Sequence, residues 1–199
     1  MGLRRPARQT SGEILFGGTR WTTADRETRR PEGISFVPQS PAHGFDPLHR
    51  LRWQLNQLSR RIGGRPTVHG GLLETLSLPD PDRFYPHEWS RGMQQRLLLA
   101  MALMSDPKLL IMDEPTSALD PIIAAQVLQE VQRLAKAQGF AVAMVTHDLA
   151  LAAQYATHIS IMEHGRIVES GPSETVLTAP STTYARELVA HRHWRVAVA

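Results

Sequence analysis

The stretch that decides the fold is Leu109-Leu110-Ile111-Met112-Asp113-Glu114, four apolar residues that run directly into two carboxylates. A second apolar run, Ala141-Val142-Ala143-Met144-Val145, leads into Thr146-His147-Asp148. Both runs predict buried strands, and residues 121–138 between them predict a helix with a proline in its first turn and a glycine after its end. Apolar strands that alternate with helices predict an α/β protein with a mostly parallel, covered sheet.

Earlier in the chain, residues 11–18 predict a short strand that ends in a Gly-Gly turn, and residues 33–38 predict a strand stopped by a proline. Residues 40–88 contain six prolines and two Gly-Gly pairs between helical patches, which predicts a loop-rich helical lobe. Residues 91–105 are rich in good helix formers, and Ser90 stands in front as an N-cap.

The carboxyl-terminal part predicts a helix over 149–156, a hairpin over 159–169 and helices over 173–178 and 182–193. We therefore expect one domain over residues 1–199, with a helical subdomain at about 40–105 inserted in the α/β core. A carboxyl-terminal extension is expected at about 172–199.

Composition excludes several classes of protein. The 199 residues are 42% hydrophobic and 21% charged, as in ordinary globular proteins. Cysteine is absent, which excludes disulfides, cysteine metal sites and thiol catalysis. The longest apolar run, Leu97 to Met104, is far shorter than the roughly 18–20 residues of a membrane helix, and Met1 to Thr10 lacks the apolar region of a secretory signal.

Charge is unevenly distributed along the chain. Residues 1–100 carry 15 arginines against 9 acidic residues, and residues 101–199 carry 7 basic against 10 acidic residues. A basic half is compatible with binding of nucleic acid or of a phosphate-rich ligand. These arginines are scattered and have no aromatic residues between them, so we interpret them as solvated surface and expect no nucleic-acid partner.

Acidic side chains follow the strand predicted at 109–112. Ligands of open α/β sheets bind beyond the carboxyl ends of the strands, and Mg²⁺ prefers oxygen ligands. Asp113 there could hold the metal, and Glu114 could orient an attacking water in phosphoryl transfer. His147 lies 34 residues after Asp113, at the end of the next apolar strand. The alternative is that the two acidic residues have no function and only mark the point where a strand leaves the core.

A second feature lies at the predicted helix start, 23 residues before Asp113. Backbone N–H groups and the helix dipole make such a start an anion site. Ser90 adds a hydroxyl there, and Gly92 allows close approach of the backbone. Upstream, Gln39 directly follows the strand predicted at 33–38.

This ordered set of motifs resembles the ATP-binding cassette (ABC) ATPases, over the chain from Ser11 to Trp194. The resemblance implies a P-loop NTPase-like fold, with ATP and Mg²⁺ as cofactors. It implies that Gln39 is the Q-loop glutamine, which contacts Mg²⁺, and that Asp113 and Glu114 are the Walker B pair. His147 would be the switch histidine that senses the γ-phosphate.

The same resemblance assigns Ser90, Gly92 and Met93 to the signature motif, which closes on the γ-phosphate held by a partner subunit, and Asp120 to the D-loop. Catalysis would then rest on Glu114 and His147.

A finer resemblance is to the ATPase subunits of dipeptide, oligopeptide and nickel importers. It rests on Pro38-Gln39-Ser40-Pro41, on Tyr85-Pro86-His87-Glu88 and on the tail from Gly165 to Gly171. It implies a peripheral subunit on the cytoplasmic face of the cell membrane. Its partners would be integral-membrane permeases, a second ATPase subunit and, indirectly, a solute-binding protein.

Two departures from the family pattern stand out. Trp89 and Arg91 replace the usual Leu and first Gly of the signature motif. The phosphate-binding motif Gly-x-x-x-x-Gly-Lys-Ser/Thr is not found in the sequence, and Gly63-Gly64-Arg65-Pro66-Thr67, the nearest imitation, lacks both the lysine and the spacing. In the family this motif precedes the strand that lies here at residues 12–16, so we expect the amino-terminal strand and P-loop to be missing.

Three interpretations follow. One is an ATP-hydrolysing importer subunit. The second is a truncated, non-catalytic chain that cannot bind ATP alone and at most supplies its signature motif to a partner. The third, an ATPase of the DNA-repair or chromosome-organising type, is favoured only by the basic half and lacks the expected coiled-coil insertion.

Overall fold

The computed structural model describes residues 12–21, 32–63 and 68–190, and its centre is a parallel sheet of three strands. β3 (Ile34–Val37), β4 (Leu109–Asp113) and β5 (Ala141–Val145) lie in the order β3-β4-β5. The register aligns Val37 with Met112 and Met112 with Met144. The predicted parallel α/β core is therefore confirmed.

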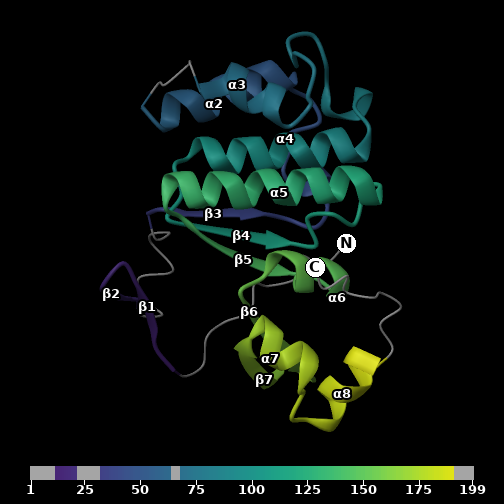
Figure 1. The fold of residues 1–199 in the computed structure, drawn as a ribbon. Helices are drawn as coiled ribbons and strands as arrows, with labels where there is room; N and C mark the ends of the chain where they lie inside the picture. Colours follow the sequence, from purple (N-terminus) through teal and green to yellow (C-terminus); the bar gives the residue numbers. More distant parts are fainter. Residues whose placement is uncertain (1–11, 22–31, 64–67, 191–199) are drawn as a thin grey trace.

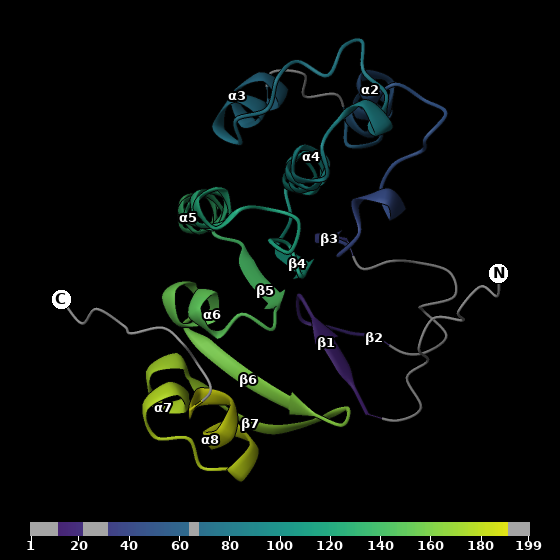
Figure 2. The ribbon, with the colours of Figure 1, turned by 90° about the vertical axis from the view of Figure 1, so that its right-hand side faces the viewer.

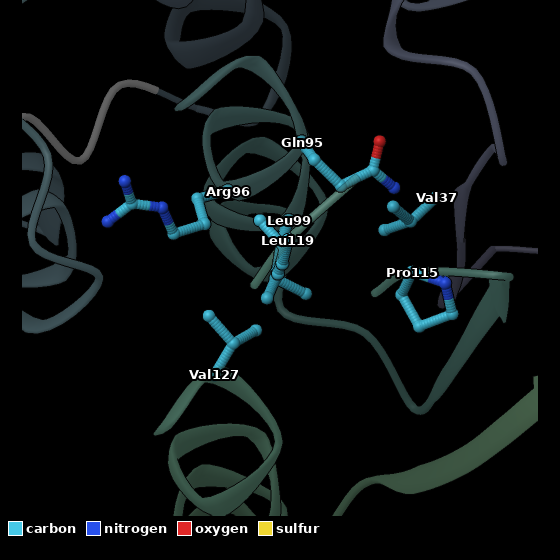
Figure 3. A pocket seen from close by; sticks show the side chains of 7 residues that line it. All are labelled: Val37, Gln95, Arg96, Leu99, Pro115, Leu119 and Val127. Atoms are coloured by element: carbon cyan, nitrogen blue, oxygen red, sulfur yellow. The ribbon is translucent and has the colours of Figure 1, made fainter. Parts of the chain in front are cut away.

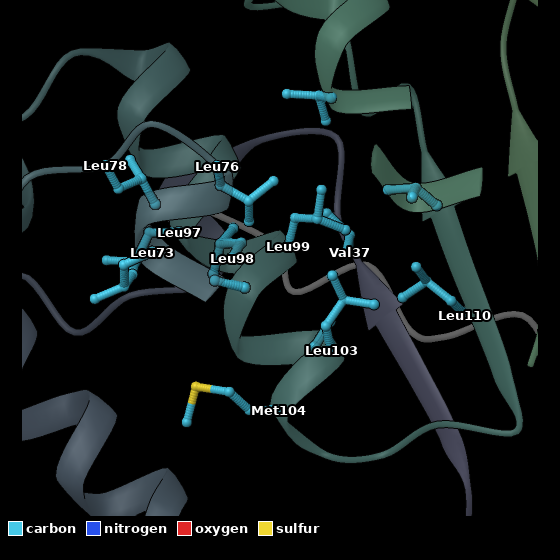
Figure 4. Packing of buried hydrophobic residues seen from close by; sticks show 14 of the residues in the cluster. Val37, Leu73, Leu76, Leu78, Leu97, Leu98, Leu99, Leu103, Met104 and Leu110 are labelled. Carbon is cyan, nitrogen blue, oxygen red and sulfur yellow. The ribbon is translucent and has the colours of Figure 1, made fainter. Parts of the chain in front are cut away.

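Two helices cover one face of this sheet (Figure 1): α4 (Arg91–Met104) and α5 (Pro121–Gln138). The Ser90 hydroxyl caps α4 by accepting from the Met93 N–H at 3.2 Å, as predicted. The leucines of α4 form a layer between the helical lobe and the sheet (Figure 4), and Leu97 is completely buried. This apolar layer fixes α4 relative to β3 and β4.

Residues 141–145 form the predicted strand, β5, but the prediction that this strand is buried is wrong. Most of its side chains are exposed. On the outward face of β5, Val145 is 59% exposed. This face continues the outward face of β3, on which Phe36 is 57% exposed. α4 and α5 cover only the face that carries Val37 and Met112, and no other described element buries the opposite face. An apolar run alone cannot show whether both faces of a strand are covered.

The helical lobe comprises α2 (Leu51–Arg61), α3 (Val68–Thr75) and two short 3₁₀ helices, η1 (Pro41–His43) and η2 (Pro86–Glu88). α2 and α3 lie on the side of α4 that faces away from the sheet (Figures 1 and 2). Gly44 permits the close approach of η1 to α4, because a Cβ there would collide with Leu98.

Two hairpins lie outside the parallel sheet. β1 (Ile14–Phe16) pairs with β2 (Thr19–Trp21) around the predicted Gly-Gly turn, and β6 (His158–Glu163) pairs with β7 (Arg166–Pro172). β2 lies beyond the strand predicted at residues 11–18.

A second hydrophobic cluster lies at the carboxyl-terminal end of the described chain. α7 (Ser173–Thr178) and α8 (Thr183–Ala190) pack with the β6–β7 hairpin there (Figure 2). The last three residues of the helix predicted over 182–193 lie outside the described residues.

α6 (Leu149–Tyr155) joins the two clusters. Its Leu151 and Tyr155 pack against the first, and its Ala152 belongs to the second. Among the described helices, none combines the length and apolar character needed to cross a bilayer.

Candidate functional site

The parallel sheet brings three of the predicted site residues to one edge. Asp113 is the last residue of β4, Gln39 follows β3 by two residues and His147 follows β5 by two residues. Since the three strands are parallel and in register, their carboxyl ends meet at the same edge. Gln39 and His147 are exposed there, and Asp113 is half-buried.

Glu114 and His147 are in direct contact. The Glu114 Oε1 lies 2.6 Å from the His147 Nδ1, across 33 positions of sequence. The Glu114 side chain is 17% exposed, whereas that of His147 is 80% exposed. The carboxylate is therefore sheltered at the base of the site, and the imidazole ring faces outward.

Glu114 has a backbone φ of +47°, in the left-handed region that non-glycine residues seldom occupy. Its N–H donates to the Val145 carbonyl at 2.9 Å, and its carbonyl accepts from the Ser117 hydroxyl at 3.0 Å. These bonds hold the strained turn between β4 and the loop that leads to α5. Such strain is typical of functional sites, where surrounding structure maintains it.

The contact changes the electrostatics of the histidine. The hydrogen bond to Glu114 raises the pKa of His147, and the negative charge of the same carboxylate raises this pKa further. A protonated imidazole donates to the carboxylate, so the two side chains form an ion pair below the raised pKa. The pair links the ends of β4 and β5.

The residues predicted for the signature motif lie at the start of α4. The Ser90 hydroxyl accepts from the Met93 N–H, and its own proton is not used in that bond. Arg91 is the first residue of α4, so it occupies helical backbone without strain. A Cβ on Gly92 would lie 3.0 Å from the Leu119 Cδ2, which places this helix start directly against the loop before α5.

Asp120 has a structural role, as a helix cap, that was not among its predicted roles. Its Oδ1 accepts from the N–H groups of Ile122 and Ile123, at 3.1 and 3.0 Å, and so caps α5. An aspartate directly before a helix that opens with proline is a sufficient signal for this cap. The predicted D-loop role would require the carboxylate to serve a second partner.

The sequence profile of the family described as "ABC transporter" matches residues 1–117, which is more than half of the chain. The chain belongs to the ABC transporter family. Its structure resembles one described as an ATP-binding subunit of an ABC transporter, with 27% identity and a TM-score of 0.70, over 84% of this chain and 69% of the other. An ATP-binding cassette dimer bound to ADP and phosphate has a TM-score of 0.71 at 24% identity and supports the fold alone, covering 82% of this chain and 74% of its own.

Relatives of this ABC chain carry transport names. A peptidoglycan transport ATP-binding protein YejF of Agrobacterium fabrum is 37% identical over 195 residues, covering 92% of this chain and 36% of the relative. A dipeptide transport ATP-binding protein DppD of Haemophilus influenzae is 33% identical over 201 residues, covering 95% and 61%. The chain therefore spans about a third to three fifths of the length of these relatives.

The described residues of this ABC chain fit part of a magnesium nucleotide. The carboxylates of Asp113 and Glu114 and the amide of Gln39 are oxygen donors of the kind that Mg²⁺ takes, and the start of α4 suits an anion. The sequence has no Gly-x-x-x-x-Gly-Lys-Ser/Thr motif to hold the other phosphates. The hollow between α4, α5 and β3 (Figure 3) has no room even for water, so it is not a nucleotide pocket.

Proposed function

We propose that the chain is the ATP-binding and ATP-hydrolysing part of an ABC importer for peptides, nickel or a similar small solute. The observation that carries this proposal is the Glu114–His147 contact, made at the edge of the sheet where Asp113 and Gln39 also lie. The names of the relatives, which refer to peptidoglycan, dipeptide and peptide transport, support the peptide class.

Each residue would have a separate task. Asp113 and Gln39 would hold Mg²⁺, which neutralises charge on the phosphates when bound. Since the contact with His147 engages Oε1 of Glu114, Oε2 is the oxygen that would face a water and orient it. His147 would keep the carboxylate in this direction and present its ring to the γ-phosphate.

The assembly would contain two ATPase subunits on the cytoplasmic face of the membrane, docked on two permeases. Ser90, Gly92 and Met93 would act on the nucleotide of the partner subunit, and Asp120 would lie between the two. A solute-binding protein would take part through the permeases. Selection of the solute would then lie outside this chain.

A second candidate function is that of a subunit that only lends its signature motif. It is favoured by one observation: the sequence lacks the phosphate-binding motif that would hold the chain's own nucleotide. In that case Ser90 and Gly92 would act on the nucleotide of a complete partner, and Glu114 and His147 would have no reaction to serve.

One experiment separates the two candidates. The chain is assembled with a complete ABC ATPase subunit and permeases, and solute-stimulated ATP hydrolysis is measured for Glu114→Gln and for Gly92→Asp. Loss of about half or more of the rate in both variants supports a catalytic chain. Loss only with Gly92→Asp supports the second candidate, and no loss in either variant contradicts both.

A further inference from the structure

The first two turns of α4 anchor three different segments of the chain. The Gln94 Nε2 donates to the carbonyls of Pro86 and Trp89, at 2.8 and 2.9 Å. The Arg96 guanidinium donates to the carbonyls of Leu76 and Ser77, at 2.7 and 2.9 Å. Gln95, between these two residues, reaches in a third direction.

The Gln95 side chain joins α4 to the end of β3. It is 3% exposed, and its Nε2 donates to the Pro38 carbonyl at 3.1 Å, across 57 positions of sequence. Pro38 is the residue immediately before Gln39. Figure 3 shows the carboxamide beside Val37, the last residue of β3.

This amide is costly for a residue that only fills space. The Gln95 Oε1 is buried and has no hydrogen-bond partner among the described residues. A buried polar atom without a partner destabilises a protein, and a methionine of similar length would fill the same volume without that cost. The hydrogen bond to Pro38 is therefore the feature that distinguishes glutamine from an apolar residue here.

We propose that Gln95 is a positioning residue that fixes the backbone before Gln39 to the helix that carries Ser90 and Gly92. A displacement of the Gln39 segment is then transmitted to the start of α4, and a displacement of α4 is transmitted to Gln39. The inference rests on the proposed function only for the tasks assigned to these three residues, because the mechanical link itself is a matter of geometry.

The test uses pairs of spin labels attached to introduced cysteines. The chain has no cysteine of its own, so only the chosen positions are labelled. Labels at His43 on η1 and Gln129 on α5, both exposed, report the segment after Gln39. Labels at His87 on η2 and Gln129 report the segment held by Gln94. Distance distributions from pulsed electron resonance are compared for the parent chain, Gln95→Met, Gln95→Glu and Gln94→Met.

We expect both Gln95 variants to broaden the His43–Gln129 distribution, with about a fivefold rise in displaced conformers, and to leave the His87–Gln129 pair unchanged. Gln94→Met, the matched control, should broaden the His87–Gln129 distribution and leave the His43–Gln129 distribution unchanged. Gln95→Glu keeps the shape of the side chain but, when ionised, has no donor for Pro38, so it separates hydrogen bonding from packing.

The proposal is overturned if Gln95→Met leaves the His43–Gln129 distribution unchanged, or if every variant broadens both pairs equally, as general loosening of the core would. Circular dichroism shows whether each variant is folded. No nucleotide is needed, so a failed hydrolysis assay contradicts the proposed function without touching this result, and an unchanged distribution contradicts only the positioning role of Gln95.

Discussion

Glu114 is the residue in which strain and chemistry coincide. Its left-handed backbone costs on the order of 1–3 kcal/mol. That conformation makes the sharp turn after β4 and leaves the side chain in contact with His147. A strand that simply continued outward would send alternate side chains to opposite faces of the sheet. The strain is therefore the local cost of bringing the ends of two strands together.

The titration of His147 tests this contact. We expect the pKa of His147 to lie above its usual 6.5 in the parent chain, because Glu114 stabilises the imidazolium. Glu114→Gln should lower that pKa, as measured by the NMR shifts of the ring protons. The contribution of the pair to stability is present in full below about pH 6.5 and is lost as the pH rises through the raised pKa.

The control for this titration is Glu169→Gln, which removes a carboxylate from another hydrogen-bond network. It should leave the His147 pKa unchanged. An equal fall in both variants would mean that general charge, and not the contact, raises the pKa.

At the scale of elements, the long helix α5 depends on the hydrogen bonds that cap its first turn. Asp120→Ala removes the cap that accepts from Ile122 and Ile123, and should lower the free energy of unfolding by about 1 kcal/mol. Asp120→Asn keeps a capping oxygen and should retain most of the stability. Urea denaturation followed by circular dichroism measures both, and equal losses would show that charge, not capping, is what matters.

The start of α8 is held by a carboxylate. Glu169 accepts from the N–H groups of Ser181 and Thr182, and these bonds lower its pKa below the usual 4.5. A lowered pKa means stability that is present above about pH 4.5 and is lost as the pH falls through the folded value. We expect amide exchange in α8 to quicken in this acid range.

The matched variant for this effect is Glu169→Gln, which has no charge to lose. Its exchange in α8 should be faster near neutral pH and nearly constant as the pH falls to 4, once the intrinsic dependence of exchange on pH is corrected. An acid response as large as that of the parent chain would assign the effect to another carboxylate.

At the scale of the whole molecule, α6 is the element that couples the two hydrophobic clusters. The Tyr155 hydroxyl donates to the Ala125 carbonyl of α5 at 3.2 Å. Tyr155→Phe should weaken this link by about 1 kcal/mol and separate the unfolding of the two clusters in calorimetry. Tyr184→Phe, which lies in the second cluster alone, should shift the transition without splitting it.

The sequence predicted most of this molecule because its local signals agree with the fold. Ser90 and the apolar run after it predicted α4. The apolar strands predicted that the polar residues which follow them lie at one edge of the sheet. The burial of β5 was predicted wrongly, since coverage of a strand depends on distant parts of the chain. The left-handed backbone of Glu114 could not be predicted, because this conformation is usually occupied by glycine or asparagine. The burial of Gln95 could not be predicted either, because glutamine is usually an exposed residue.

The open face of the sheet, with Phe36 and Val145 at its surface, has a practical consequence. Dyes that fluoresce in apolar surroundings respond to surface of this kind even when a protein is fully folded. A melting curve recorded with such a dye would begin from a high signal and understate the transition. Intrinsic fluorescence does not depend on dye binding to this face. Trp89, one of four tryptophans, is buried in the main core, so its emission changes when the core loses its packing.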